Sequence, residues 1–399
     1  HLPGQTLPPA YAVMNPHRAD CAYPEKNLAG VGVAFKLVQA LWQMEGKELF
    51  AEHLDIAALG TVADLVPLVG ENRKIVQMGL QQMAEHPCVG IRALIEVAGL
   101  ADKSINTGQV GFQLAPRLNA AGRIETARHG AELLLTEDTA CAARMAGELN
   151  ALNTERRDLE QDILAEAELQ LADFTPDVPA IVVAGEEWNA GVIGIVASRL
   201  TEQYYRPAVV LTESEGVATG SARSVSGFDV YKAVADCSDL LENFGGHTYA
   251  AGLSLKVENV AAFTERFEAY VEKHILDEQT QASLEIDAVL DFKDINFGFY
   301  KQLRRFSPFG PDNAKPLFCT KHVYDYGTSK VVGRGQEHIK LELVDNKSNN
   351  IMNGIAFGQS SRARYIKTKR AFDICYAIEE NSHKRGDVQL QIEDIRPCE

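Results

Sequence analysis

Arginine, small hydroxyl residues and glycines gather in two short segments of the sequence. Gly220–Ser224 (GSARS) places a glycine, two hydroxyls and a guanidinium within five positions, and Gly245-Gly246-His247 follows about 20 residues later. Exposed backbone amides, hydroxyls and guanidinium groups are donors that hold phosphate oxygens. Gly-Gly pairs also occur in simple turns. The pattern predicts a phosphate-binding site formed by Ser221, Arg223, Ser224, Gly245, Gly246 and His247.

A second motif with anion-binding chemistry is Pro116–Arg123 (PRLNAAGR). Arg117 and Arg123 stand six residues apart around small residues. Small residues let a backbone approach a ligand closely, and arginine offers paired donors to phosphate. We expect Pro116 and Gly122 to prevent a long regular helix here. The motif indicates a phosphate contact, and the alternative is a solvated helix face.

Asp64 and Asp55 are the only charged residues in the apolar run Leu54–Leu68. Such a run forms a buried strand or a buried helix. A carboxylate in apolar surroundings is costly unless it is paired or binds a metal. If the run is a strand, Asp64 stands at its carboxyl end, where open α/β sheets bind ligands. The alternative is that Asp64 caps the amino end of a helix.

Cations surround an aromatic ring near the end of the sequence, in Ser360–Arg370 (SSRARYIKTKR). Charges that follow phosphates and a ring that stacks on bases are typical of single-strand binding. The alternative is a solvated loop with a charge run. We predict a nucleic-acid groove formed by Arg362, Arg364, Tyr365, Lys367 and Lys369.

Charge is divided unevenly along the chain. Residues 1–299 hold 22 Lys and Arg against 43 Asp and Glu, a balance of −21, whereas residues 300–399 have a balance of +5. An acidic body with a basic terminal module suits a protein that attracts a polyanion at one place. The composition, with 46% hydrophobic and 24% charged residues, excludes disordered and collagen-like proteins.

The seven cysteines are scattered, and none stands in CxxC spacing. This pattern argues against a disulfide framework and against a zinc site, and it favours a reducing cytoplasm. No apolar run reaches the about 18 residues of a membrane span. The sequence starts with His1 and lacks the features of a signal peptide, so we interpret the chain as a fragment whose start lies upstream.

Hydrophobic patterning divides the chain into four expected pieces, with bounds at 1–135, 136–173, 174–278 and 279–399. The second piece has no proline and is rich in Ala, Leu, Glu and Arg, which predicts one long helix over 138–173. In the third piece, two buried strands flank a packed helix, which predicts a βαβ unit followed by an amphipathic helix. These elements are Ala180–Ala184, Gly191–Leu200, Ala208–Thr212 and Ala261–His274.

Short alternating strands fill the fourth piece, and they predict a small OB-like β-barrel. The expected strands are Leu284–Leu290, Lys330–Val332, His338–Val344, Ile351–Phe357, Phe372–Ala377 and Val388–Ile395. Phe306–Phe318 between them is rich in turn-forming residues.

A series of motifs follows in one order along the chain: His1-Leu2-Pro3-Gly4, Leu28–Ala34, Leu59–Pro67, Glu71-Asn72-Arg73, Pro116–Arg123, Trp188, Gly191–Leu200, Gly220–Ser224, Phe244–Gly252, Pro308-Phe309-Gly310 and Leu390–Ile395. This order resembles the RecJ-type exonucleases of the DHH phosphoesterase superfamily along essentially all 399 residues. The resemblance implies an α/β fold class. A partial DHH phosphoesterase domain would be joined by a long helix to the DHH-associated, substrate-binding domain, and an OB-like β-barrel would follow.

The resemblance also assigns roles to individual residues. Asp64 would be a ligand of a catalytic Mn²⁺ or Mg²⁺, and His1 would be the last histidine of the Asp-His-His motif, close to the scissile phosphate. Arg117, Asn119 and Arg123 would line the cleft, where an arginine is associated with the 5′ end of the substrate. The two phosphate-binding segments predicted above would hold substrate phosphates. The family's upstream aspartates, which supply most metal ligands, do not occur in this sequence.

The function that the resemblance implies is 5′→3′ hydrolysis of single-stranded DNA, in repair and recombination, by metal-assisted attack of water. The fragment itself is expected to be inactive. Relatives work with helicases and single-strand-binding protein. Two alternatives stay open: a DHH phosphodiesterase that acts on short oligonucleotides or cyclic dinucleotides, and a non-catalytic nucleic-acid-binding relative.

Overall fold

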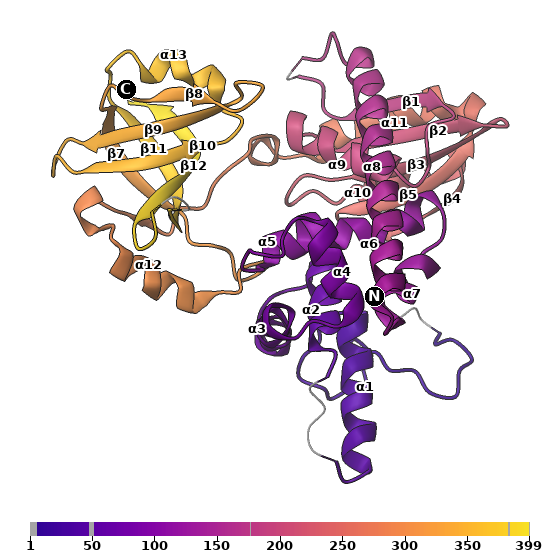
Figure 1. Ribbon diagram of the computed structural model, residues 1–399. Helices are drawn as coiled ribbons and strands as arrows, with labels where there is room; N and C mark the ends of the chain where they lie inside the picture. Colours follow the sequence, from indigo (N-terminus) through magenta and orange to yellow (C-terminus); the bar gives the residue numbers. More distant parts are fainter. Residues whose placement is uncertain (1–5, 48–51, 176, 382–383, 399) are drawn as a thin grey trace. The chain divides into compact units, whose positions relative to one another are not determined.

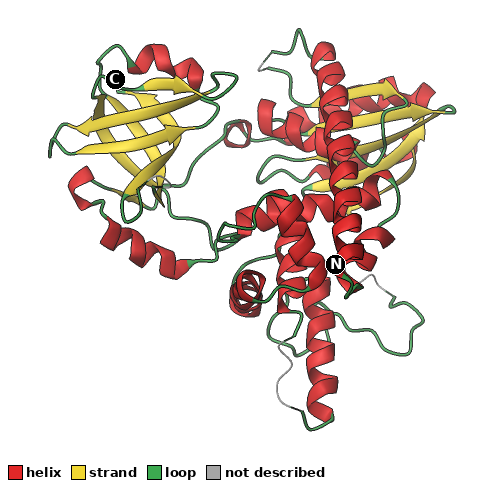
Figure 2. Ribbon diagram, viewed as in Figure 1, coloured by secondary structure: helices red, strands yellow, loops and turns green. Residues whose placement is uncertain are grey.

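The computed structural model of the chain describes residues 6–47, 52–175, 177–381 and 384–398 (Figure 1). They form two compact units. One unit joins residues 1–82 with 284–399, and the other comprises residues 83–283. In the described residues, Figure 2 shows strands in two regions, a five-stranded sheet and a barrel, with helices around them and in the rest of the chain. None of the described helices is long and apolar enough to cross a membrane.

Helices occupy the described residues before the first strand. They are α1 (Gly30–Met44), α2 (Leu54–Ala63), α3 (Gly70–Glu85), α4 (Val89–Val97), α5 (Thr107–Gln109), the π-helical turn η1 (Val110–Leu114), α6 (Ala115–Ile124), α7 (Arg128–Leu135) and α8 (Thr139–Gln170).

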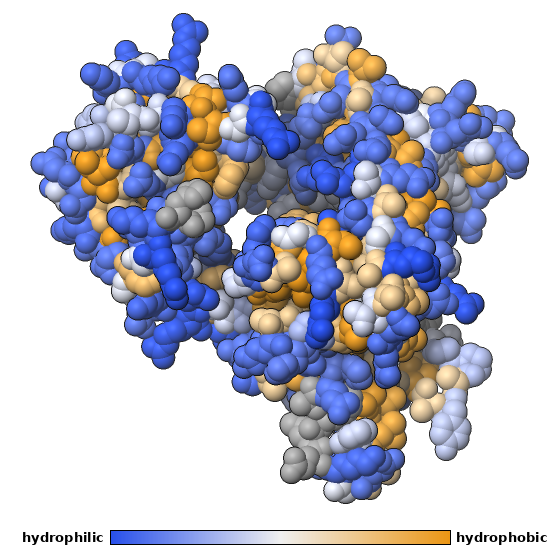
Figure 3. All heavy atoms as spheres, viewed as in Figure 1, coloured by the Kyte–Doolittle hydropathy of each residue, from blue (hydrophilic) through white to orange (hydrophobic). Residues whose placement is uncertain are grey.

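Small residues let the first helices pack closely. A Cβ on Gly79 of α3 would lie 2.3 Å from the carbonyl oxygen of Leu54, and one on Gly60 of α2 would lie 2.7 Å from the Val31 side chain. The apolar run that contains Asp64 forms the helix α2. Its small residues, such as Gly60 and Ala58, allow close contacts with α1 and α3. Figure 3 shows apolar surface over α1, where Leu37, Val38, Leu41 and Met44 are exposed.

Helix α8 is the long helix expected from the sequence. Its 32 residues rise about 48 Å. Asp138 caps its start by accepting the Cys141 N–H at 2.9 Å. The helix packs against α4, α6 and α7 and also against α9 (Ile193–Tyr204) and β1. It thereby fixes the α6 motif relative to the sheet of the same unit.

The five-stranded sheet has the order β1-β2-β3-β5-β4. Its strands are β1 (Ile181–Glu186), β2 (Ala208–Ser214), β3 (Val217–Arg223), β4 (Leu241–His247) and β5 (Ala250–Lys256). Strands β1 and β2 are parallel and joined through α9, so the predicted βαβ unit is confirmed. Helices α8 and α9 cover one face of the sheet, and α10 (Val230–Asp236) and α11 (Val260–His274) cover the other.

A closed barrel forms the last part of the chain. Strands β7 (Phe318–Asp325), β11 (Phe372–Glu380), β12 (Val388–Pro397), β10 (Ile351–Ala356) and β9 (His338–Asp345) pair in this order, and β9 pairs back with β7. Five strands therefore close on themselves, as in an OB fold. Fully buried Phe372, Ile374 and Tyr376 fill the barrel core.

Smaller elements flank the barrel. They are β6 (Ala288–Val289), β8 (Lys330–Val332), α12 (Phe297–Leu303), α13 (Ala363–Ile366) and the 3₁₀ turns η5 (Phe292–Asp294), η6 (Arg304–Phe306) and η7 (Ser360–Arg362). Three further 3₁₀ turns lie in the other unit, namely η2 (Ser238–Leu240), η3 (Val257–Asn259) and η4 (Asp277–Thr280).

Two strand predictions in this region need correction. The strand expected over Leu284–Leu290 is reduced to β6 (Ala288–Val289) with flanking hydrogen bonds from Asp287 and Leu290, because Leu284 and Ile286 before it are exposed and do not pack in the core. Strand β7 was not among the predicted strands, although its start lies at the end of the turn-rich segment. The alternation of FCTKHVYD is broken by a bulge at Lys321 and His322, which hides the two-residue period.

Candidate phosphate-binding site

Two arginines converge beside the first turn of α9. Arg123, at the end of α6, donates from Nη1 to the Gly191 carbonyl oxygen at 2.8 Å. Arg223, at the end of β3, donates from Nη1 to Ser221 Oγ at 2.8 Å. A Cβ on Gly194 would lie 2.9 Å from Arg223 Nη2 and 3.0 Å from Ser221 Oγ. A glycine at position 194 therefore lets α9 begin directly against these two side chains.

The loop before α9 also depends on glycine. A Cβ on Gly191 would lie 2.4 Å from the Arg123 carbonyl oxygen, a backbone atom that cannot move aside. Asn189 Oδ1 accepts the Gly191 N–H at 2.8 Å, and the Asn189 carbonyl accepts the Val192 N–H at 2.9 Å. Sequence reasoning did not assign a role to Gly191 or Gly194. The signal was present, because two glycines three residues apart at a helix start indicate close backbone approach.

Electrostatics at this point favour an anion. The pKa of Arg223 is lowered because its guanidinium is withdrawn from water and because Arg123 adds a second positive charge. Desolvation also lowers the pKa of Arg123, against the opposite influence of Glu160. Two cations that repel each other beside a helix amino end are stabilised by a bound anion. A phosphate oxygen carries a negative charge and accepts hydrogen bonds from guanidinium and backbone N–H groups.

The pairing of β3, β5 and β4 places His247, from the second predicted segment, in one row with Arg223 across the sheet. Arg223 pairs with Ala250 on β5, and Ala250 pairs with His247 on β4. The neighbours Ala222 and Ala251 lie in the core toward α10 and α11, so the row of Arg223, Ala250 and His247 faces the opposite side. At the usual spacing between strands, the backbones at Arg223 and His247 are about 10 Å apart across the sheet.

A second row lies next to the first and has the same orientation. Ser221 pairs with Gly252, and Gly252 pairs with Gly245. Glycines and Ala250 therefore form an open floor between the donors of β3 and those of β4. A Cβ on Gly246 would lie 2.3 Å from the Ala250 carbonyl oxygen, which explains the glycine there. Every residue of Glu242–His247 is exposed, so this end of the sheet is open to solvent.

Ser224 is used differently from the sequence prediction. Its hydroxyl donates to the Phe228 carbonyl oxygen at 2.8 Å, and its N–H donates to the Tyr249 carbonyl oxygen at 3.2 Å. Both bonds hold the turns that follow β3 and β4. Ser224 thus supports the site by positioning its neighbours.

Arg117 and Asn119 do not join the Arg123 site directly. The motif Pro116–Arg123 lies within the ten-residue helix α6, with Pro116 in the first turn, where its missing N–H costs little. Six helical residues turn about 600°, so Arg117 and Arg123 point about 120° apart. Arg117 donates from Nε to Asn150 Oδ1 on α8 at 3.0 Å, and Asn119 is exposed. Arg117 therefore ties α6 to α8.

A buried ion network holds α8 against α9. Glu160 of α8 accepts from Arg156 Nη1 at 2.7 Å and from Arg199 Nε of α9 at 3.1 Å. The side chains of Glu160 and Arg156 are only 10% and 12% exposed. Desolvation lowers the pKa of Arg156, and Glu160 opposes that shift. No sequence motif drew attention to Glu160, because Glu and Arg are frequent on any solvated helix.

Asp64 lies in the other unit, at the carboxyl end of α2. Its N–H donates to the Gly60 carbonyl oxygen at 3.0 Å, and its side chain is exposed. The placement corrects both sequence interpretations, since Asp64 neither ends a strand nor caps the amino end of a helix. The run became a helix because its apolar and small residues allow close helix packing.

The loop after Asp64 is anchored by the Glu71-Asn72-Arg73 motif. Buried Asn72 donates from Nδ2 to the carbonyl oxygens of Asn27 at 2.7 Å and Pro67 at 3.1 Å. The Leu68 N–H donates to the Pro311 carbonyl oxygen at 2.7 Å, and Arg73 donates to that of Phe306 at 2.9 Å. The motif thus positions Asp64 through its loop.

The described residues do not complete a site for Mn²⁺ or Mg²⁺. These ions take about six oxygen ligands, and Asp64 offers one carboxylate. The group of three metal-type ligands found in the described part of the chain does not include it. His1, predicted to lie near the scissile phosphate, falls outside the described residues.

The predicted nucleic-acid groove is partly helical. Arg362 and Arg364 are in η7 and α13, and Lys367 and Lys369 follow, all four with exposed side chains. Tyr365 packs against the barrel core, edge-to-face with Phe372, and its hydroxyl donates to the Ala371 carbonyl oxygen at 3.1 Å. The Tyr365 ring therefore packs against the barrel core.

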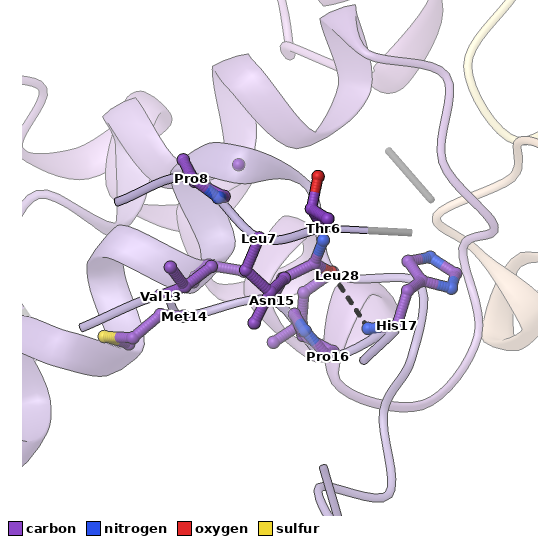
Figure 4. Close-up of a pocket in the computed structure, with 11 residues that line it drawn as sticks. Thr6, Leu7, Pro8, Val13, Met14, Asn15, Pro16, His17 and Leu28 are labelled. Atoms are coloured by element: carbon purple, nitrogen blue, oxygen red, sulfur yellow. Dashed lines mark hydrogen bonds between the residues drawn. The ribbon is translucent and has the colours of Figure 1, made fainter. Parts of the chain in front are cut away.

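A separate cavity of about 380 Å³ lies near the start of the described chain. Figure 4 shows mostly apolar residues around it, with Asn15 Oδ1 accepting the His17 N–H at 2.9 Å. Its lining comprises Thr6, Leu7, Pro8, Val13, Met14, Asn15, Pro16, His17, Leu28, Gly30 and Val33. No residue of the predicted sites is in this lining.

Comparison with known proteins agrees with the fold. Residues 177–273 match the model of the DHHA1 domain, and residues 286–394 match that of the RecJ OB domain. The single-stranded-DNA-specific exonuclease RecJ of Dickeya dadantii is 35% identical over 419 residues, which cover 100% of this chain and 72% of that protein. The chain belongs to the RecJ family.

Other RecJ proteins are also similar to this chain. RecJ of Bacillus subtilis is 41% identical over 402 residues, which cover all of this chain but 50% of that protein, so the chain spans about half of its length. The crystal structure of Thermus thermophilus RecJ in complex with Mn²⁺ matches with a TM-score of 0.86 and 32% identity, over 100% of this chain and 57% of that one. The structure of the same protein with Mg²⁺ matches with a TM-score of 0.80 and 31% identity, over 95% and 57%.

Proposed function

We propose that this chain is the substrate-holding part of a nuclease that degrades single-stranded DNA in the 5′→3′ direction, in DNA repair and recombination. The observation that carries the proposal is the pair of donor rows on the five-stranded sheet, which Arg123 and the start of α9 extend. The names of the RecJ relatives support the reaction and its substrate. Attack of water on a phosphodiester would be assisted by Mn²⁺ or Mg²⁺, with Asp64 as one ligand and His1 near the scissile phosphate.

The donor rows suit a sugar-phosphate backbone better than a base. Guanidinium, hydroxyl, imidazole and backbone N–H groups contact phosphate oxygens without reading sequence. The floor of glycine and alanine between them has no side chain that recognises a base edge. We therefore propose that Arg123, Ser221, Arg223 and the Gly245-Gly246-His247 segment hold phosphates, and that Arg123 contacts the 5′ end.

A digestion assay with the complete gene product tests this function. With Mn²⁺ present, a single strand labelled at its 3′ end should shorten from the 5′ end, and a duplex should resist. Hydrolysis confined to dinucleotides or cyclic dinucleotides would instead support a small-substrate phosphodiesterase. Binding of the strand without hydrolysis would support a non-catalytic relative.

The metal requirement leads to a prediction for the 1–399 chain alone. It should bind Mn²⁺ weakly and show little nuclease activity, because Asp64 supplies one of about six ligands. Calorimetric titration with Mn²⁺ and digestion of a labelled single strand measure the two quantities. Robust Mn²⁺-dependent digestion that disappears in the purified Asp64→Ala variant would contradict the prediction, since that variant controls for contaminating nucleases.

The barrel should add a salt-dependent contribution to single-strand binding. Four exposed cations near α13 would give a log–log salt slope near −3, from about −0.7 per phosphate contact. Replacing Arg362, Arg364, Lys367 and Lys369 by alanine should flatten the slope measured by fluorescence anisotropy. Replacing Lys232 and Lys256, two cations of the other unit that pair with neighbouring carboxylates, is the control. An unchanged slope in the first variant would leave these cations as a solvated surface.

We also propose a location and partners for the protein. No disulfide is recorded for the cysteines, all of which lie in the described residues, and this supports a cytoplasmic location. A helicase and single-strand-binding protein are the partners that we propose from the family, without assigning a surface to either.

A further inference from the structure

Three side chains of different metal-binding chemistry converge on the outside of the barrel. They are His322 of β7, Asp373 of β11 and Cys398, which directly follows β12 (Figure 1). One ligand atom of each lies within 4.8 Å of the other two. Positions 322, 373 and 398 are too far apart for a spacing motif, so the lack of CxxC spacing gave no information about this cluster.

A β-bulge places His322 in the cluster. Phe372 pairs with Val323 and Ile374 pairs with Thr320, so both Lys321 and His322 oppose Asp373. Such a bulge redirects a side chain that regular alternation would send elsewhere. His322 has a left-handed φ of 57°, and its N–H donates to Asp373 Oδ1 at 2.9 Å. The backbone thus fixes the carboxylate while the ring stays free to act as a ligand.

The end of β12 supplies the thiol on the same face. Phe372 is fully buried in the barrel core, so its neighbours Ala371 and Asp373 point outward. The Cys398 N–H donates to the Ala371 carbonyl oxygen at 3.3 Å, which continues the ladder past Pro397. Cys398 Sγ donates to Asp373 Oδ1 at 3.2 Å. The thiol and the carboxylate are therefore already neighbours.

The ligand set selects the class of metal. Imidazole nitrogen, carboxylate oxygen and thiolate sulfur together suit Zn²⁺, whereas Mg²⁺ and Mn²⁺ favour oxygen. In a tetrahedral zinc site the bond lengths put ligand atoms about 3.3–3.8 Å apart. The distance of 3.2 Å between Cys398 Sγ and Asp373 Oδ1 is close to this range. The ligand atoms all lie within 4.8 Å of one another, so small side-chain movements would bring the remaining distances into the range.

We propose that His322, Asp373 and Cys398 bind one Zn²⁺, with a fourth position open to water. Binding releases the thiol proton to solvent, because the thiolate is the ligand. The ion would fasten the residue after β12 to β7 and β11 and so stabilise the closed barrel. This site is separate from Asp64, which does not belong to the cluster.

Titration of the 1–399 chain with Co²⁺ tests the proposal, since Co²⁺ reports thiolate ligation through a charge-transfer band. One equivalent should produce this band together with visible bands of tetrahedral cobalt, and Zn²⁺ should abolish both. Cys398→Ser should lose the charge-transfer band, and His322→Ala should weaken binding by at least about tenfold. Cys21→Ser and His129→Ala, which change a thiol and an imidazole elsewhere, should behave like the parent chain.

A thermal measurement gives a second readout. Excess Zn²⁺ should raise the melting temperature of the barrel in the parent chain and not in Cys398→Ser. No charge-transfer band in the parent chain, or an undiminished band in Cys398→Ser, would overturn the proposal. If Cys398→Ser does not fold by circular dichroism, His322→Ala decides, and parental affinity for Co²⁺ in that variant overturns it.

Discussion

Replacing Arg223 by alanine is expected to weaken the binding of a 5′-phosphorylated single strand to the 1–399 chain by roughly ten- to a hundredfold. The loss of one charge-assisted hydrogen bond to phosphate costs about 1.5–3 kcal/mol. Arg223 lies beside Ser221 and the start of α9, and its pKa is lowered by burial and then by the charge of Arg123. Fluorescence anisotropy with a labelled oligonucleotide at one fixed salt concentration measures the change.

Matched variants separate the site from general charge. Arg128→Ala, in the same unit, removes an exposed arginine that pairs with Glu132 and should leave affinity unchanged. Arg123→Ala should reduce the preference for a 5′-phosphorylated over a 5′-hydroxyl strand. His247→Ala should weaken the binding of both strands. If the Arg123, Arg223 and His247 variants all bind both strands as the parent does, these residues only shape the fold.

Replacing Glu160 by alanine should destabilise the unit formed by residues 83–283 by about 3–5 kcal/mol. Removal of one partner from a buried ion pair leaves an uncompensated charge in the interior. Arg156 would lose its partner at 2.7 Å while its side chain stays buried, and Arg199 would lose its link to α8. The shift of the urea midpoint for this unit measures the loss.

Helix α8 itself offers the control. Arg144 and Glu148 have the same spacing and the same 2.7 Å distance as Arg156 and Glu160, but their side chains are 62% and 56% exposed. Glu148→Ala should therefore cost less than about 1 kcal/mol. Equal midpoint shifts for the two variants would show that burial of the Glu160 network contributes nothing to stability.

Local patterns predicted the elements whose cause is local. The runs AIVVA and AVVLT became the parallel strands β1 and β2, because apolar runs of this length are stable only when both faces are covered. The absence of proline predicted α8 within a few residues at each end. The barrel strands β9, β10, β11 and β12 were also predicted, although β11 contains a register irregularity, whereas the bulged strand β7 was not.

Features that depend on register were not specified by local patterns. The motifs predicted that Arg223 and His247 share one site, but their place in one row across β5 depends on strand pairings that the sequence does not specify. The same holds for Glu160, whose burial arises from the approach of α9. Tyr365 shows the converse: its flanking cations suggested a base-stacking ring, whereas tertiary packing turned it toward Phe372.

Strand β4 stands at the edge of the five-stranded sheet and is exposed along most of its length. A free edge of this kind is a template for pairing with another chain, and hence for aggregation. Here Gly245 and Gly246 give poor strand propensity, and a register irregularity between Leu241 and Asn243 bends the strand. The glycines that form the floor of the proposed phosphate-binding site are therefore also expected to protect the unliganded protein from self-association in a crowded solution.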